Sequence, residues 1–280
     1  MPSWVSAASS KGRTRSPGRW ALRISAVMAP KATCGKEGAV KKAVVVAAVL
    51  VAALGLADTA LASHVEHDLA REGVEAEVSA VPFVWSGISG RVPRVTVKRT
   101  DADIPGPGVG TVSVEMFNLK LDTPSDALRG EVVGADARLV RRRIRLDGVG
   151  FGELLGITDL DMANPYDISP TGGVASEARL TGTAPDAREP ATVVVTLRLV
   201  DGTFRMRPSQ LLDVADGDTQ AVLDGFTFDL DTRELPLGGT ADLVQLRGGS
   251  LELSRDRVNT VVEPADLEPL AGASTLGQHD

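Results

Sequence analysis

The chain has 280 residues with 30 basic and 37 acidic side chains, a net charge of −7. Residues 1–62 hold nine of the bases and two of the acids, which leaves 21 bases and 35 acids, a net charge of −14, in residues 63–280. So acidic a body argues against sequence-independent binding to nucleic acids, which requires clustered cations that displace counterions. It also argues against a simple electrostatic attachment of the body to anionic lipid.

An apolar run of fifteen residues, 43–57, follows Lys41 and Lys42 and precedes the small-residue sequence Ala60-Leu61-Ala62. A basic segment, a short apolar segment and a small-residue site in this order are typical of a secretory signal. The run is short for a helix that crosses about 30 Å of hydrocarbon. We predict that residues 41–62 are a signal peptide cleaved after Ala62 or an uncleaved signal anchor. Both alternatives direct the body to the cell envelope, on the extracytoplasmic side, either secreted or anchored.

Residues 1–40 are rich in Ser, Arg, Lys, Gly and Ala and show no periodicity. We interpret them as disordered, or as an extension upstream of a true start at Met28. The single cysteine, Cys34, lies in this region, so we expect no disulfide in the body. Residues 63–271 are long enough for one domain with its own core, and residues 272–280 are predicted to be a flexible tail.

Most of the body alternates apolar and polar residues with a period of two, which is typical of strands with one buried face. Such strands favour antiparallel sheets. A change of parity at Met116–Phe117 predicts a β-bulge, and Asp201-Gly202 and Gly248-Gly249 predict hairpin turns. We predict strands over residues 74–80, 94–98, 112–121, 193–199, 204–207, 226–231, 251–254 and 258–262.

Helices are predicted in three places. The clearest spans residues 58–73, where Leu61, Val65 and Leu69 recur every four residues and Gly73 is a stop signal. Residues 153–157 form at most a single turn. Residues 208–215 begin with a proline, which is favoured at the first position of a helix. The predicted fold class is therefore α+β, mostly antiparallel β.

Motifs for metal binding and for nucleotide binding are weak. His64 and His67 lie three residues apart, but a zinc site needs further nitrogen or sulfur ligands. We interpret both as solvated helix residues and predict no metal and no cofactor. The sequence Gly148-x-Gly150-x-Gly152 lacks the spacing of the dinucleotide-binding motif and its βαβ context. We interpret these glycines as residues at a bend of the chain.

A basic cluster stands out in the acidic body, at Arg138, Arg141, Arg142, Arg143 and Arg145. On an extended strand three of these arginines share one face, whereas Arg142 falls on the opposite, apolar face. An arginine on an apolar face needs a partner. One interpretation is structural: Arg142 pairs with an internal carboxylate, or a local bulge changes the face on which it lies. The other is that Arg142 binds a phosphate by bidentate hydrogen bonds.

Several short segments together resemble the actinobacterial LmeA-like phospholipid-binding family, which was once known as a domain of unknown function. The resemblance covers residues 43–262 and depends on the order and spacing of the segments. They are Val81-Pro82-Phe83, a turn at Gly90, Val95-x-Val97, Arg138-Leu139-Val140, Phe151-Gly152-Glu153-Leu154-Leu155-Gly156, Leu199-Val200-Asp201-Gly202-Thr203-Phe204, Leu235-Pro236-Leu237 and Gly248-Gly249-Ser250-Leu251-Glu252-Leu253. The sequence departs from the family in its longer leader and in the basic stretch around Arg142.

The resemblance implies a fold similar to one unit of the tubular lipid-binding proteins. In that fold a strongly curved sheet wraps a long N-terminal helix and leaves an elongated apolar cavity. The implied function is non-catalytic: the protein carries or presents a phospholipid, its partners are phospholipid and the membrane surface, and it supports envelope lipid or lipoglycan maturation. The residues expected to line the cavity are Phe83, Trp85, Leu154, Leu155, Leu211, Leu212, Phe226 and Phe228, with Arg142 as the candidate for the headgroup.

Two other functions stay open at this point. A structural or adaptor protein of the envelope would have an ordinary core and use an exposed strand edge for its partners. An envelope hydrolase would use carboxylates such as Asp159 and Asp161, which must face each other across a cleft. For each candidate lining residue, ordinary core packing is an alternative to lipid contact.

Overall fold

The computed structural model describes residues 37–70, 73–80, 82–104, 106–165, 176–215 and 217–271. Most of the predicted leader, including Met28 and Cys34, and the predicted tail at residues 272–280 lie outside the described residues. The chain divides into two compact units, residues 1–49 and residues 50–280. The second unit contains the described strands.

Helix α1 (Glu37–Leu69) contains both the apolar run and most of the helix predicted over residues 58–73. The two predicted segments are one helix, and Gly73, with φ of 72°, lies beyond its end at Leu69. Residues 44–69 are long and apolar enough to cross a membrane, a criterion that a signal sequence also meets. The side chains of Val51 and Leu56 are exposed, whereas those of Val65 and Leu69 are buried in the core.

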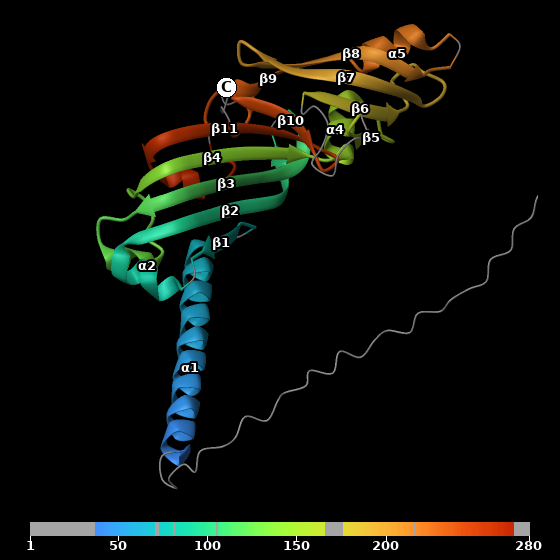
Figure 1. The fold of residues 1–280 in the computed structure, drawn as a ribbon. Helices are drawn as coiled ribbons and strands as arrows, with labels where there is room; N and C mark the ends of the chain where they lie inside the picture. Colours follow the sequence, from blue (N-terminus) through green and yellow to red (C-terminus); the bar gives the residue numbers. More distant parts are fainter. Residues whose placement is uncertain are drawn as a thin grey trace, which may run out of the picture. The chain divides into compact units, whose positions relative to one another are not determined.

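The first sheet has six antiparallel strands in the order β1-β2-β3-β4-β11-β10 (Figure 1). Long strands at its centre pair along most of their length, which makes a surface wide enough to bury one face. The strands are β1 (Glu75–Ser79), β2 (Arg91–Ile104), β3 (Gly108–Lys120), β4 (Asp136–Leu146), β10 (Leu243–Arg247) and β11 (Ser250–Val261).

The β-bulge predicted at Met116–Phe117 is wrong. The pairing of β3 with β2 runs without a shift through both residues, and the register shifts between Arg99 and Ala102 instead. The change of parity coincides with Asn118, which has a left-handed backbone with φ of 51°, and Leu119 directly after it is buried.

The second sheet has five antiparallel strands in the order β5-β6-β7-β8-β9. They are β5 (Asp161–Ala163), β6 (Glu177–Gly182), β7 (Ala191–Val200), β8 (Thr203–Asp213) and β9 (Phe228–Asp231). Both predicted hairpin turns are confirmed. Asp201 and Gly202 join β7 to β8, Gly248 and Gly249 join β10 to β11, and all four have positive φ, as a type I′ turn requires.

The helix predicted over residues 208–215 is wrong, because β8 continues to Asp213. Pro208 pairs with Val195 next to a register shift between Val194 and Val195. Proline is tolerated in a sheet at such an irregularity, where its missing N–H is not needed. The tertiary pairing with β7 therefore overrides the local preference of proline for the start of a helix.

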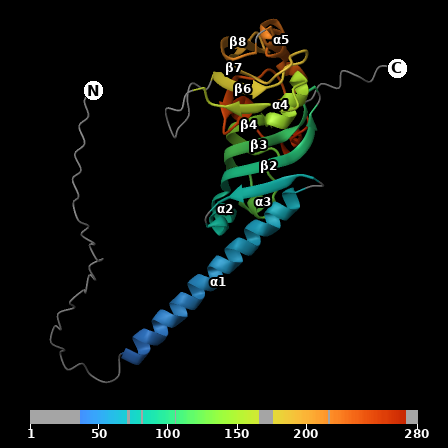
Figure 2. The same cartoon turned by 90° about the vertical axis from the view of Figure 1, so that its right-hand side faces the viewer.

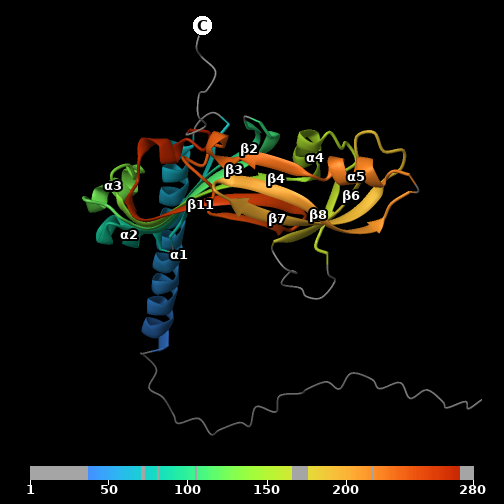
Figure 3. The same ribbon diagram turned by 90° about the horizontal axis from the view of Figure 1, so that it is seen from above.

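Short helices lie at the ends of the sheets (Figures 2 and 3). They are α2 (Phe83–Ser89), α3 (Pro124–Arg129), α4 (Gly148–Leu155) and α5 (Thr219–Gly225), with 3₁₀ turns η1 (Thr232–Glu234) and η2 (Pro264–Leu267). The turn predicted over 153–157 is the end of α4. Figure 3 shows α2 and α3 at the end of the first sheet near the C-terminal turns of α1, and α4 beside the second sheet.

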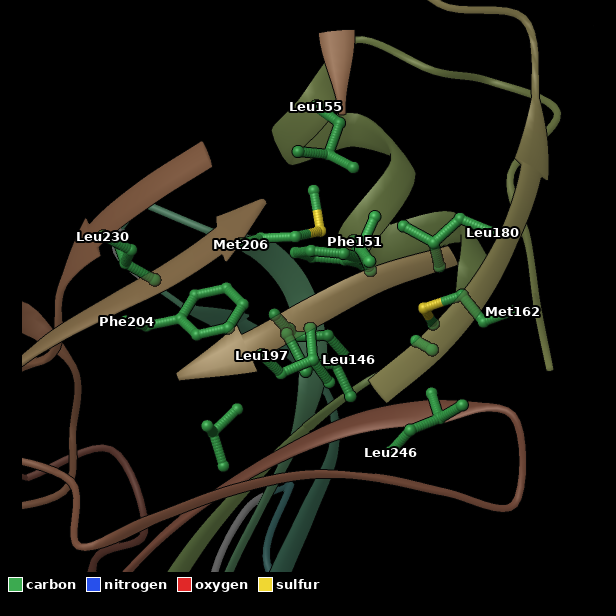
Figure 4. Close-up of a cluster of buried hydrophobic side chains, with 14 of the residues drawn as sticks. Leu146, Phe151, Leu155, Met162, Leu180, Leu197, Phe204, Met206, Leu230 and Leu246 are labelled. Atoms are coloured by element: carbon green, nitrogen blue, oxygen red, sulfur yellow. The ribbon is translucent and has the colours of Figure 1, made fainter. Parts of the chain in front are cut away.

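The buried side chains form two clusters. The junction core lies where the first sheet meets the second, and Figure 4 shows Phe151, Phe204 and Met206 packed at its centre. The α1 core contains Val65 and Leu69 of α1 together with the buried face of the strands near α2 and α3. The second sheet therefore contributes its buried side chains to the junction core, whereas the last turns of α1 contribute theirs to the α1 core.

The predicted fold class is confirmed: the protein is α+β, with antiparallel sheets and an N-terminal helix. In detail the strands form two open sheets, and α1 packs on the first sheet through Leu61, Val65 and Leu69 near its C-terminal end. An elongated apolar cavity that runs through the body stays a prediction.

Candidate functional site

A cleft of about 560 Å³ lies between α2 and the ends of the strands of the first sheet. We call it the α2 cleft. Its lining mixes an aromatic ring, aliphatic side chains, hydroxyl groups and three bases, a combination that suits an amphipathic ligand. The lining residues are Ala80, Pro82, Trp85, Ser86, Ser89, Arg91, Val92, Pro93, Asn118, Leu119, Lys120 and Arg138.

Helix α2 forms one wall of the cleft and is fixed by contacts from outside its own sequence. Its N-cap residue, Pro82, provides no side-chain hydrogen bond. The Oδ1 atom of Asp58 on α1 instead accepts a hydrogen bond from the backbone N–H of Val84, at 2.7 Å. Phe83 is fully buried beneath the helix, and Gly90, with φ of 64°, ends it. Helix α2 is therefore fixed in place as a wall of the cleft by its contacts with other parts of the chain.

The outer face of α2 is apolar and exposed. The exposed fractions are 40% for Val84, 63% for Trp85 and 63% for Ile88. These three positions lie on one side of a helix, whereas Phe83 and Ser86 point into the protein and are buried. We refer to Val84, Trp85 and Ile88 as the α2 face.

Three bases from three different strands meet in the α2 cleft. Arg91 on β2 is the direct register partner of Lys120 on β3, and Arg138 comes from β4. Like charges directly opposite each other in a sheet are unfavourable, so a bound anion would stabilise this pair. Asp136 is opposite Lys120 on the other side. Within the described part of the chain, however, no carboxylate forms an ion pair with any of the three bases.

A second cleft, of about 300 Å³, lies between α4 and α5. Leu154, Leu155 and Phe228 line it, so it brings together three of the predicted cavity residues. Phe228 packs edge-on against Phe151, with the ring centroids 6.4 Å apart. Asp186 and Asp224 also line this cleft, which makes it less suited to a phosphate than the α2 cleft.

The remaining predicted cavity residues lie in different surroundings. Trp85 lines the α2 cleft, whereas Phe83 is fully buried beneath α2 and is not among the residues that line the cleft. Phe226 is fully buried in the junction core. Leu211 and Leu212 lie on β8 with exposed side chains and line neither cleft. The residues predicted to line one cavity thus lie in two clefts, in the core and on the surface of β8.

Arg142 is buried, with 5% of its surface exposed, and lies on the apolar face of β4 as the alternation predicts. Its Nη1 atom donates to the carbonyl oxygens of Ala271, at 2.6 Å, and Pro236, at 3.2 Å, and its Nη2 atom donates to that of Ala265. Its Nε atom lies 3.5 Å from a carboxylate oxygen of Asp266. Burial lowers the pKa of the guanidinium and Asp266 opposes that shift. Internal groups therefore satisfy this arginine.

Arg141, Arg143 and Arg145 of β4 form ion pairs across the polar face of the first sheet. The guanidinium of Arg141 donates two hydrogen bonds to Asp256, at 2.7 and 2.6 Å. This contact lowers the pKa of the Asp256 carboxyl. Arg143 and Arg145 both pair with Glu252, at 3.1 and 3.3 Å. Most of the basic cluster is thus neutralised within the fold, and Arg138 is the member that faces the α2 cleft.

Of the two carboxylates that a hydrolase would use, Asp159 is held by hydrogen bonds within the fold. Asp159 accepts hydrogen bonds from the backbone N–H and the hydroxyl of Thr183, both at 2.8 Å, and these lower the pKa of its carboxyl. Asp161 is exposed on β5. His64 lies 3.4 Å from Asp68 on α1. Among the residues that the structure describes, no group of three His, Cys, Asp or Glu side chains could hold a metal ion.

The glycines at 148, 150 and 152 belong to the first turns of α4. A Cβ atom added at Gly150 would lie 2.1 Å from the carbonyl oxygen of Val109, and one added at Gly152 would lie 2.3 Å from that of Ile157. These positions need glycine because another backbone segment passes too close for a side chain. Their spacing reflects packing of α4.

Sequence reasoning identified Trp85 but missed Arg91 and Lys120 as members of the site. Each is a single base at the end of a strand, and nothing in the linear sequence distinguishes it from other surface bases. The strand register pairs them, and the position of α2 places them beside Trp85. A register predicted for residues 91–104 against 108–120 could have indicated the like-charged pair.

The fold and the α2 cleft suit a protein that binds an amphipathic anion near the C-terminal end of a long apolar helix. A model of the family described as LmeA-like phospholipid-binding matches residues 48–254. The chain therefore belongs to the LmeA-like phospholipid-binding family. The comparison with curated proteins gives no match, and neither does the comparison with solved structures.

Proposed function

We propose that this protein is a cell-envelope lipid carrier that takes up a phospholipid and presents it at a membrane, without catalysing a reaction. The family supports phospholipid as the ligand. The observation that carries the proposal is the α2 cleft, where the indole of Trp85 and three bases without carboxylate partners among the described residues line one hollow. A phospholipid has the matching chemistry, because it joins a phosphate to acyl chains.

The α2 cleft is our first choice for the headgroup and the adjoining part of the acyl chains. Arg91, Lys120 and Arg138 would contact the phosphate by charge-assisted hydrogen bonds. Arg142, the headgroup candidate from the sequence, is a poorer choice since its donors already meet carbonyl oxygens and Asp266. The cleft lined by Leu154, Leu155 and Phe228 is the second choice, as a place for an acyl chain.

Binding of this kind needs no catalytic group. Each buried methylene contributes about 0.8 kcal/mol, so part of one acyl chain could supply most of the affinity. Leu211 and Leu212, whose side chains are exposed, stay candidates for contact with chains that extend beyond the α2 cleft. Phe83 and Phe226 are fully buried and would contact a chain only if the core around them rearranged. Support for envelope lipid or lipoglycan maturation would follow from delivery of lipid to an enzyme that consumes it.

We further propose that α1 stays attached as a membrane anchor on the extracytoplasmic side. Cleavage after Ala62 would remove Asp58, whose carboxylate caps α2, and Leu61, which packs against the α1 core. The family match begins at residue 48 and so includes most of the apolar run. N-terminal sequencing of the protein from its native membrane tests this: we expect a start well before residue 58, and a start at Ser63 would contradict the anchor.

Lipid binding is tested by native mass spectrometry of the full chain, released from membranes in mild detergent. We expect adducts with the masses of phospholipids. The double variant Arg91→Gln/Lys120→Gln should lower the bound fraction, whereas the matched charge loss Arg179→Gln/Arg198→Gln on the second sheet should not. A wild-type chain free of lipid, which also takes up none from phospholipid vesicles, would contradict the proposed function.

A further inference from the structure

The α2 face is an exposed apolar surface for which the described residues provide no cover. Val84, Trp85 and Ile88 project from a helix whose other side is fixed by the buried ring of Phe83. Isolated apolar residues on a surface are ordinary. On α2, however, a tryptophan and two branched aliphatic side chains are grouped on one face beside a cleft. Such a group indicates an interaction surface.

The connection between α1 and α2 identifies what covers this surface. The hydrogen bond from Val84 to Asp58 places the start of α2 at the position on α1 where the apolar run ends. On the preceding turns of α1 the side chains of Val51 and Leu56 are exposed. If those turns lie in a bilayer, the α2 face lies at its surface, the depth that tryptophan side chains favour.

Charge indicates which kind of bilayer surface fits. Residues 63–280 have a net charge of −14, which opposes approach to an anionic surface. Arg91, Lys120 and Arg138 are a local exception beside the α2 face, and the described carboxylates leave them without ion pairs. Such bases are attracted to anionic headgroups within about a Debye length of the surface.

We propose that the α2 face inserts into the headgroup region of an anionic phospholipid bilayer, where Arg91, Lys120 and Arg138 meet lipid phosphates at the mouth of the α2 cleft. This inference rests on the proposed function, because docking in this orientation lets lipid pass directly between the bilayer and the cleft. It adds the membrane-contacting residues and the charge class of the membrane.

The test uses the full chain with Trp4→Phe and Trp20→Phe, so that Trp85 is the one remaining tryptophan. The protein is reconstituted into phosphatidylcholine/phosphatidylglycerol vesicles whose acyl chains are brominated close to the headgroup. We expect bromine to quench Trp85 fluorescence. Val84→Ser/Ile88→Ser, neither of which lines the cleft, should weaken this quenching. Val109→Ser/Val149→Ser, two exposed valines near α4, provides the matched control and should leave the quenching unchanged.

The charge requirement is tested in the same system. Quenching should be weaker in pure phosphatidylcholine, and Arg91→Gln/Lys120→Gln/Arg138→Gln should weaken it in the anionic vesicles to that same level. Arg179→Gln/Arg198→Gln/Arg205→Gln on the second sheet is the control for total charge. The proposal would be overturned if Trp85 emission were equal in brominated and unbrominated vesicles. It would also be overturned if the test variants and their controls changed the quenching equally. Circular dichroism checks that each variant is folded.

The result is separable from that for the proposed function. Because Trp85 also lines the α2 cleft, brominated lipid bound there quenches it as well, and the variants separate the two effects. Phospholipid adducts in native mass spectra, together with the same Trp85 quenching in Val84→Ser/Ile88→Ser as in its control, would overturn the docking of α2 and leave lipid binding intact. A quenched Trp85 in a chain that never retains phospholipid would support docking and overturn the carrier function.

Discussion

The carboxylate of Asp58 on α1 caps α2 from 26 positions away in the sequence, by accepting the hydrogen bond from the N–H of Val84. Pro82, at the N-cap position itself, contributes no such bond. The apolar helix and the wall of the α2 cleft are thus coupled through one side chain. The residue that ends the apolar run therefore also orders the candidate site.

We predict that Asp58→Ala loosens α2 by about 1 kcal/mol, the usual cost of a lost helix cap. Hydrogen exchange of the α2 amides measures the change, and Val84 should show the largest increase in exchange rate. Asp58→Asn keeps an oxygen acceptor and should retain most of the protection. If the α2 amides of Asp58→Ala exchanged as slowly as those of the wild type, the cap would be unimportant.

Gly150 is expected to tolerate no side chain. In Gly150→Ala the added Cβ would lie 2.1 Å from the carbonyl oxygen of Val109, so α4 or the start of β3 must move. Forced overpacking of this kind costs about 1–3 kcal/mol. Urea unfolding measures the loss, and Val149→Ala on the exposed side of α4 should stay close to the wild type.

Removal of Arg142 should be strongly destabilising. In Arg142→Met the buried carboxylate of Asp266 loses a cation 3.5 Å away, and three carbonyl oxygens each lose one donor. Breaking a buried pair on one side costs about 3–5 kcal/mol. The variant Arg142→Met/Asp266→Asn should recover part of this, although Arg257, which contacts both Asp266 and Glu263, then keeps only the ion pair with Glu263 of these two. If Arg142→Met unfolded in urea like the exposed Arg198→Met, the buried network would contribute little.

The Asp256 carboxyl makes stability depend on pH in the acid range. Its pKa lies below the ordinary value of 3.8, chiefly because Arg141 donates hydrogen bonds to the ionised form. A carboxyl with a lowered folded pKa stabilises the protein above its unfolded pKa, and that contribution is lost as the pH falls through the folded pKa.

We therefore predict that the free energy of unfolding in urea decreases as the pH is lowered below about 4. Asp256→Asn should flatten this decrease and should lower stability most at neutral pH. Asp161→Asn, at an exposed carboxyl on β5, is the control. A carboxyl pKa for Asp256 at or above its ordinary value, measured by NMR titration, would contradict the account.

The sequence predicts the strands well where both faces of a strand differ in polarity. On β4 the alternation correctly places Arg142 on the buried face and Arg141 and Arg143 on the other. It fails at Pro208, where the local signal for a helix competes with pairing to Val195 that only the assembled sheet provides. Local preference and tertiary pairing disagree there, and the pairing determines the structure.

The candidate site is harder to predict than the fold. Helix α2 has seven residues, too few for a helical period to emerge, and its cap comes from Asp58 on another element. Arg91 and Lys120 become neighbours only through the register of β2 with β3. The family resemblance indicated a lipid ligand, but the residues proposed to hold its phosphate come together through contacts between distant parts of the chain.

Strands β3 and β4 supply side chains to both hydrophobic clusters. On β3, Val112 belongs to the junction core and Val114 to the α1 core, and on β4, Ile144 and Val140 divide in the same way. Neither cluster can lose its packing without disturbing a strand that the other needs. Residues 50–280 should consequently melt in a single calorimetric transition, with equal van't Hoff and calorimetric enthalpies.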